Sequence, residues 1–216
     1  MLRRACCLLL LLSCAVPAAA QQKEPIGPFV ADIRGIFARH KAEPSVANDL
    51  GVSAANLPPR SIGLAGGVHF YPLRAGKVTF GFGGNFVIGR GSRTLDIPGA
   101  DATTTTKGPT VRRHFRTFSP EISLNFGHRN GWSYISGGML GRSKLYVDLA
   151  SAPAAGTAYR STINYGGGAR WFTTDHVALS VDFRWYSVAE QPAVPGGVVF
   201  QPRTTLLVLS GGIAIK

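Results

Sequence analysis

The segment from Asn164 to Ser187 alternates apolar and polar residues with the period of a β-strand. From Val177 onward, the apolar residues fall on one side and the polar residues on the other. Because successive side chains of a strand point to opposite faces, this pattern predicts an amphipathic strand. A weaker strand pattern precedes it, and only Thr173–His176 separates the two, which is short enough only for an antiparallel hairpin. The apolar face of this hairpin must meet either a protein core or lipid.

The same alternation recurs along the chain and predicts an all-β fold of eight strands. Most of the runs exceed ten residues, whereas strands of globular proteins typically have about five or six. Short turns and long loops alternate strictly between the runs, which is typical of an antiparallel up-and-down transmembrane β-barrel. The predicted strands are Phe29–Lys41, Ser61–Leu73, Val78–Gly91, Phe115–His128, Ser133–Val147, Thr162–Thr173, Val177–Glu190 and Thr204–Lys216.

The polar face of these strands consists mostly of Gly, Ser, Thr, Asn and Ala. If the apolar face were a soluble core, the polar face would meet water and should be rich in Lys and Glu. Small polar residues suit a narrow barrel interior, and bulky apolar residues suit lipid. We therefore predict that the apolar face points outward. The pattern leaves the faces of the fifth run, Ser133–Val147, unassigned.

Glycine pairs recur inside five of the runs, and Pro120 lies inside the fourth. Glycine inside a strand indicates a bulge or a close approach, and both fit the strong curvature and narrow lumen of a small barrel. Proline removes a donor from the hydrogen-bond ladder, so we expect a bulge at Pro120. The glycine pairs lie in LAGGV, FGGNF, ISGGM, YGGGA and LSGGI.

Four charged residues fall on the face that this orientation turns inward. They are Glu121, Arg170, Asp182 and Arg184. Because buried charges must pair, we predict a salt-bridge network that plugs the lumen. A gated ion path is the alternative interpretation of the same residues.

Aromatic residues lie near both ends of the predicted strands. Trp132 and Trp171 are next to short turns, and Tyr165 and Trp185 are near long loops. This distribution resembles the two interfacial aromatic girdles of a membrane barrel. Packing in a core is the alternative.

The N-terminal residues 1–20 have the pattern of a secretory signal peptide, with two arginines, an apolar run and a small-residue cleavage site after Ala20. Residues 21–216 then form a single outer-membrane β-barrel domain. Lipidation at Cys14 is an alternative to cleavage after Ala20. All three cysteines lie in this leader, so the mature chain is expected to have no disulfide.

The chain carries a net charge of +12, but an exported chain without a basic helix does not favour nucleic acid as a partner. Basic residues gather in the predicted loop Ser92–Arg116. If this loop is extracellular, its cations face lipopolysaccharide phosphates and could bind them. The residues are Arg93, Lys107, Arg112, Arg113 and Arg116.

The chain resembles the small eight-stranded outer-membrane barrels, namely the membrane domain of outer membrane protein A and the opacity-protein-like family. The signal peptide, the strand count, the loop alternation and segments such as NYGGGARWFTTDHVALSVDFRWY carry the resemblance. It implies a monomer that the assembly machinery inserts into the outer membrane, with both termini in the periplasm and a role in envelope integrity or adhesion. Such barrels usually end in an aromatic residue, whereas this chain ends Ile213–Lys216, which leaves the assembly signal open.

No catalytic motif appears, and the five histidines have no metal-ligand spacing. We therefore expect neither an enzyme nor a cofactor or metal site. Two other classes stay open. One is a soluble periplasmic, lipocalin-like binding barrel with inverted faces. The other is an outer-membrane lipid A-modifying enzyme, which would need a Ser/His pair with a carboxylate on the outer surface near one rim.

Overall fold

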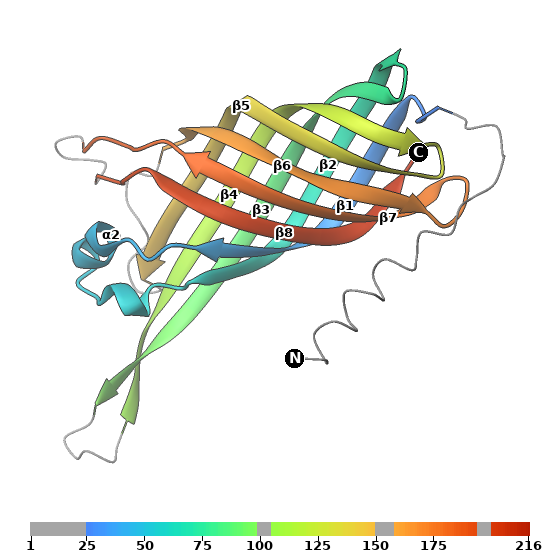
Figure 1. Ribbon diagram of the computed structural model, residues 1–216. Coiled ribbons are helices and arrows are strands. Elements are labelled where there is room, and N and C mark those ends of the chain that lie inside the picture. Colours follow the sequence, from blue (N-terminus) through green and yellow to red (C-terminus); the bar gives the residue numbers. More distant parts are fainter. Residues whose placement is uncertain (1–24, 99–104, 150–157, 194–199) are drawn as a thin grey trace, which may run out of the picture.

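The computed structural model describes residues 25–98, 105–149, 158–193 and 200–216. Within them, eight strands form a closed antiparallel barrel in which each strand pairs with the next and the last pairs with the first (Figure 1). The prediction of an eight-stranded up-and-down barrel is confirmed. The signal peptide and Cys14 lie outside the described residues. The strands are β1 (Phe29–His40), β2 (Arg60–Ala75), β3 (Val78–Pro98), β4 (Thr105–His128), β5 (Gly131–Leu149), β6 (Arg160–Phe172), β7 (Val177–Val188) and β8 (Thr204–Ile215).

The two ends of the barrel differ in their connections. Short turns join β2 to β3, β4 to β5 and β6 to β7 at one end, which we call the turn end. The long connections lie at the other end, which we call the loop end. There β3 and β4 continue past the rim as a two-stranded ribbon (Figure 1). Most of the segment 92–114, which was predicted as a loop, is therefore strand. The two strands of the ribbon pair with one register shift, between Thr94 and Asp96, and β-branched threonines favour the extended conformation.

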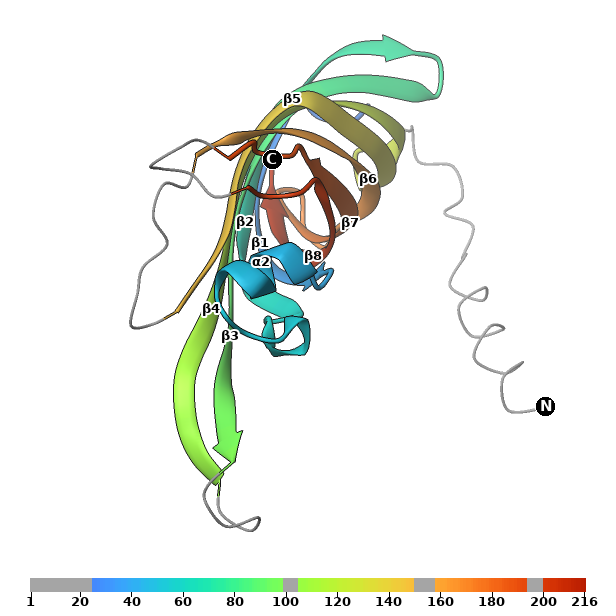
Figure 2. The ribbon, with the colours of Figure 1, turned by 90° about the vertical axis from the view of Figure 1, so that its left-hand side faces the viewer.

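The first long connection holds two short helices that the sequence did not predict, α2 (Pro44–Asp49) and the 3-10 helix η1 (Ala54–Asn56). Ala47 and Leu57 of this connection pack against Val111 of β4. Figure 2 shows α2 at the loop end, in front of the ring of strands. Among the described residues, no helix is long and apolar enough to cross a membrane.

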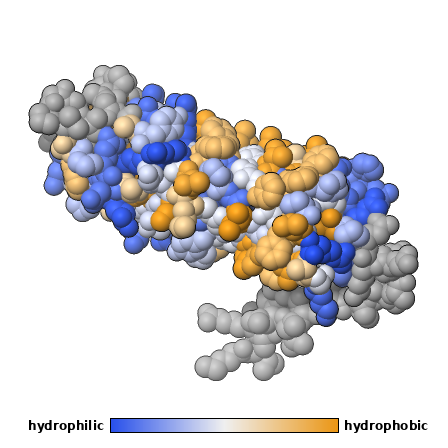
Figure 3. Space-filling model, turned by 90° about the horizontal axis from the view of Figure 1, so that it is seen from above, coloured by the Kyte–Doolittle hydropathy of each residue, from blue (hydrophilic) through white to orange (hydrophobic). Residues whose placement is uncertain are grey.

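Large apolar side chains cover the outside of the barrel. Ile62 and Ile122 have exposed fractions of 70% and 73%, and Figure 3 shows apolar residues gathered over the middle of one face, with polar residues toward its ends. The charged side chains on the inward faces of the strands are buried instead. The prediction that the apolar face points outward is confirmed. A soluble binding barrel needs the opposite arrangement, so the structure argues against the lipocalin-like alternative.

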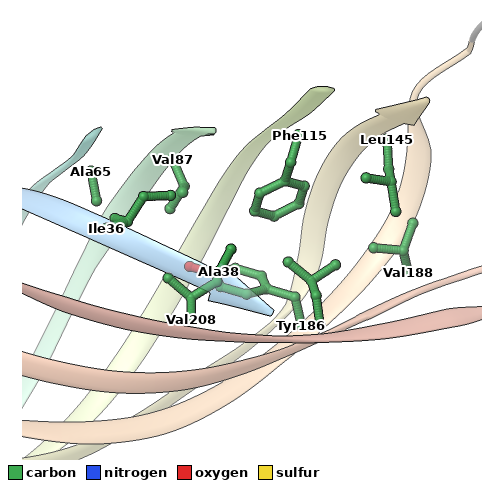
Figure 4. Packing of buried hydrophobic residues seen from close by; sticks show 10 residues of the cluster. Ile36, Ala38, Ala65, Val87, Phe115, Leu145, Tyr186, Val188 and Val208 are labelled. Atoms are coloured by element: carbon green, nitrogen blue, oxygen red, sulfur yellow. The ribbon is translucent and has the colours of Figure 1, made fainter. Parts of the chain in front are cut away.

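The inward side chains of β1 follow one another along the length of the lumen, and each layer of the interior contains at least one of them. Val30 belongs to an apolar layer near the turn end, with Tyr71, Trp132 and Tyr134. A charged layer follows in the middle. Ile36 and its neighbours then form a second apolar layer nearer the loop end, whose side chains point toward one another in Figure 4.

The fifth strand changes face along its length, which explains why its sequence pattern is ambiguous. Near the turn end, Trp132 and Tyr134 are buried, whereas farther along the strand, beyond Gly141, the buried residues include Leu145. The register against β6 shifts between Gly138 and Gly141. Because side chains alternate with period two, such a shift moves the inward positions from even to odd numbers.

Pro120 lies where β4 and β5 lose their regular pairing. The register between these strands shifts between Phe118 and Ile122, on either side of the proline. On the other edge of β4, Pro120 still pairs with Gly84 of β3. The expected irregularity is present, because proline has no N–H to donate to β5.

Candidate functional site

Six charged side chains form one chain of alternating sign across the middle layer of the lumen. Each contacts the next within 4 Å, and all are almost fully buried. In order they are Arg170, Asp32, Arg34, Asp182, Arg184 and Glu121.

The contacts along this ion chain are short at both ends. Arg170 Nη2 lies 2.6 Å from Asp32 Oδ2, and Arg34 Nε lies 2.9 Å from Asp32 Oδ1. At the other end, Arg184 Nη2 lies 2.9 Å from Asp182 Oδ2, and Arg184 Nη1 lies 2.7 Å from Glu121 Oε1. Three carboxylates thus face three guanidinium groups, and the chain is neutral when all six are ionised.

Two members of the ion chain, Asp32 and Arg34, were missed by sequence reasoning. Both lie on β1, within the predicted first strand, and their alternation with Ile33 places them on one face. Extending the face assignment to this strand would have found them. The four predicted residues are the other members.

Polar side chains hold the members of the ion chain in place. The Tyr134 hydroxyl donates to Asp182 Oδ2 over 2.9 Å, and Arg170 donates to the Tyr71 hydroxyl over 3.2 Å. Arg34 donates to Asn85 Oδ1 over 3.1 Å. Arg184 donates to Asn164 Oδ1 over 2.7 Å. These partners matter because burying a charge without full hydrogen bonding is costly.

The predicted lipopolysaccharide-facing cations do not form one mobile group. Lys107 Nζ pairs with Asp96 Oδ1 at 2.7 Å, and the Arg93 guanidinium donates to the Ala55 carbonyl. Arg112 and Arg116 are exposed on the outside of β4.

Arg113 does not face the solvent, and the prediction was wrong at this position. Its side chain is buried and donates to the Lys41 carbonyl over 3.2 Å. The segment is a strand rather than a loop, so successive residues point to opposite faces, and Arg113 points inward between Arg112 and His114.

The predicted interfacial aromatics divide between the two faces. Tyr165 and Trp171 are exposed on the outside, and Trp185 stacks on Tyr165 with ring centroids 5.5 Å apart. Trp132 is instead 3% exposed inside the barrel, where it packs edge-on against Tyr71. The prediction for Trp132 was wrong, because the faces of the fifth strand were unassigned.

No group of three or more His, Cys, Asp or Glu residues in the described part of the chain is placed to hold a metal ion. The ion chain contains three carboxylates, but each of them contacts a guanidinium group. Chemically, the six groups of the ion chain compensate one another's charge.

No protein-family model matches the chain, and no curated protein matches its sequence. Solved structures of similar fold exist. The attachment invasion locus protein Ail of Yersinia pestis is 12% identical with a TM-score of 0.47, covering 88% of this chain and 99% of its own. Neisserial surface protein A gives 14% and 0.45, with 87% and 96% covered. The outer membrane protein OprG of Pseudomonas aeruginosa gives 14% and 0.46, with 91% and 98% covered.

At these identities and scores, no activity is transferred from those proteins to this chain. The physical argument rests on the barrel itself. Closure leaves no unpaired sheet edge around the ring, and a broad band of large apolar side chains surrounds it. Such an exterior is unstable in water but is what a bilayer requires of a membrane-spanning sheet. The chain is thus built as a small eight-stranded β-barrel that spans a membrane.

Proposed function

We propose that the chain is a plugged structural barrel that supports the integrity of the outer membrane and is not an enzyme. Its loop end faces outside and its termini lie in the periplasm, where the assembly machinery inserts it as a monomer. The observation that supports this function is the balanced ion chain between two apolar layers. A barrel built for passage would line its lumen with water-accessible polar groups instead.

The cost of breaking the ion chain supports a permanent plug. An eight-stranded barrel has an interior just wide enough for side chains to fill. A water path would have to separate buried pairs such as Arg184 and Glu121 and also part the rings of Phe115 and Tyr186, which lie 5.5 Å apart. Removing one partner from a buried ion pair costs about 3–5 kcal/mol, so spontaneous opening is rare.

Conductance in planar lipid bilayers tests the plug. The native chain should show no steady current, whereas the triple variant Arg34→Ala, Asp182→Ala and Phe115→Ala should conduct, because it opens both the charged layer and the contact between the Phe115 and Tyr186 rings without changing net charge. Folding of both is checked by their heat-shifted mobility on gels. Steady or voltage-gated current through the native chain would favour a gated ion path and overturn the plug.

The second candidate function is interaction at the cell surface through lipopolysaccharide phosphates. The exposure of Arg112 and Arg116 on the outside of β4 favours it. Neutralising both residues should reduce the lipopolysaccharide that copurifies with the barrel. Arg113→Gln should leave that amount unchanged, because Arg113 points inward. An unchanged amount in the Arg112/Arg116 variant would exclude this interaction.

A further inference from the structure

Basic side chains form a one-sided patch on the outside of the barrel, at the loop-end border of its apolar band. They come from five adjacent strands, β1 to β5. On the outer face of β6 to β8 at this level lie Ser161, Ser187 and Thr205 instead. The basic residues are Arg39, Arg60, Arg90, Arg116, Arg142 and Lys144.

The strand register places these cations against the apolar band. Ile62 pairs with Arg90, and Ile88 pairs with Arg116. On the next pair of strands, Phe118 pairs with Arg142. Arg90, Arg116 and Arg142 therefore each lie beside an apolar residue near the border of the band, at the depth where acyl chains meet head groups.

The patch has no acidic counterpart in the described part of the chain. No carboxylate there lies within salt-bridge distance of any of the six cations. The contacts that two of them make are with aromatic rings: Arg60 lies 5.9 Å from the ring centroid of Phe37, and Lys144 lies 5.6 Å from that of Tyr146. These contacts orient the cations but leave their charge unneutralised.

A hollow of about 380 Å³ lies within the patch, on the wall formed by β2 and β3. Arg60, Arg90 and Ser92 are among the residues that line it. Ile62 lies in the same lining and is 70% exposed toward the membrane. The hollow thus combines phosphate-binding donors with an apolar contact for an acyl chain.

We propose that this hollow binds a phosphate group of an outer-leaflet lipid of the lipid A class. Arg60 and Arg90 bind the phosphate oxygens, and the acyl chains follow the apolar band below Ile62. The guanidinium fork suits a phosphate because it offers parallel donors, and the border of the bilayer strengthens the attraction relative to open water. This inference rests on the proposed orientation, with the loop end outside, but not on the plug.

Binding of bisphosphorylated lipid A to the detergent-solubilised full chain tests the proposal, with native mass spectrometry as the readout. Arg60→Gln with Arg90→Gln should weaken binding about tenfold or more, since two charge-assisted contacts are lost. The matched control is Arg74→Gln with Lys77→Gln, which removes the same charge from exposed residues of the β2–β3 hairpin at the turn end. It should change binding less than about twofold, because neither residue belongs to the patch.

Two comparisons separate a site from general charge attraction. Lipid A without its phosphates should bind the native chain as weakly as the Arg60/Arg90 variant binds the phosphorylated form. Equal weakening by both charge variants would overturn the site. Binding of inorganic phosphate as tight as that of lipid A would show a site for free phosphate instead. Conductance of the native chain would refute the plug and leave this proposal standing.

Discussion

Arg34 Nη1 lies 3.4 Å from Asp182 Oδ1, and this contact joins β1 to β7 across the lumen. Without it, the ion chain would separate into two groups of opposite net charge. The group of Arg170, Asp32 and Arg34 would carry one positive charge, and the group of Asp182, Arg184 and Glu121 one negative charge. The contact therefore joins two oppositely charged groups into one neutral ion chain.

Asp182→Asn should be among the most destabilising single changes in the barrel. The carboxylate accepts from the Tyr134 hydroxyl and contacts both Arg34 and Arg184. Removing its charge leaves buried guanidinium charge without compensation, which costs about 3–5 kcal/mol. Urea unfolding of the barrel in detergent micelles measures this loss.

The matched control is Asp96→Asn, on the β3–β4 ribbon. Asp96 also forms an ion pair, with Lys107, but its side chain is 59% exposed. Exposed pairs contribute about 0–1 kcal/mol, so the free energy of unfolding should hardly change. A similar loss in both variants would show that the interior ion chain contributes nothing special.

Variants that each retain one tryptophan should report which face that tryptophan occupies. Trp171 is 54% exposed on the outside and should be quenched strongly by brominated acyl chains in vesicles. Trp132 is 3% exposed inside the barrel and should be quenched much less. Strong quenching of Trp132 would place it in the aromatic girdle and contradict the faces that the structure gives β5.

Alternation along the sequence predicts all eight strands and the faces of most of them, because a strand half in lipid and half in a lumen separates its residues strictly. It fails at β5, where the shift between Gly138 and Gly141 breaks the period of two. Trp132 was assigned to the wrong face for this reason. Alternation also says nothing about the β3–β4 ribbon beyond the membrane, where neither face meets lipid, and so Arg113 was placed in a loop.

The sequence leaves open whether each glycine pair marks a bulge or a close approach, and the structure contains both cases. The pair in ISGGM coincides with the register shift of β5. Gly168, in YGGGA, lies in regular pairing opposite Tyr134 and Asp182. A Cβ there would meet the Tyr134 hydroxyl oxygen at 2.7 Å. The sequence could not separate these cases, because the partner of a glycine is set by strand register.

Gly168 is not a member of the ion chain, but Gly168→Ala should disturb the chain through Tyr134. The added methyl group would displace Tyr134, whose hydroxyl donates to Asp182, and would also press on the Val181 carbonyl. Overpacking of this kind costs about 1–3 kcal/mol. Gly211→Ala is the matched control in β8, since a Cβ there would meet only the Ser180 carbonyl, at 3.8 Å. Equal urea midpoints for the two variants would contradict the close approach at Gly168.

The stability of the barrel should fall in acid partly through His40, at the loop-end rim beyond the apolar band. Burial, with a smaller contribution from the Arg113 guanidinium, lowers the pKa of His40 from 6.5 to about 3. The folded chain keeps His40 neutral, whereas the unfolded chain protonates it below pH 6.5. The unfolded state then binds more protons, so this contribution is complete above pH 6.5 and is lost progressively as the pH falls toward 3.

His40→Gln isolates this contribution, because glutamine cannot titrate but can still hydrogen-bond the Ser61 hydroxyl, which lies 2.9 Å from His40 Nε2. Between pH 7.5 and pH 4.5, the native chain should lose about 2–3 kcal/mol more of its unfolding free energy than the variant does. All other titrating groups cancel in that difference. Parallel pH profiles for the two chains would mean that His40 is protonated as readily in the folded state as in the unfolded state.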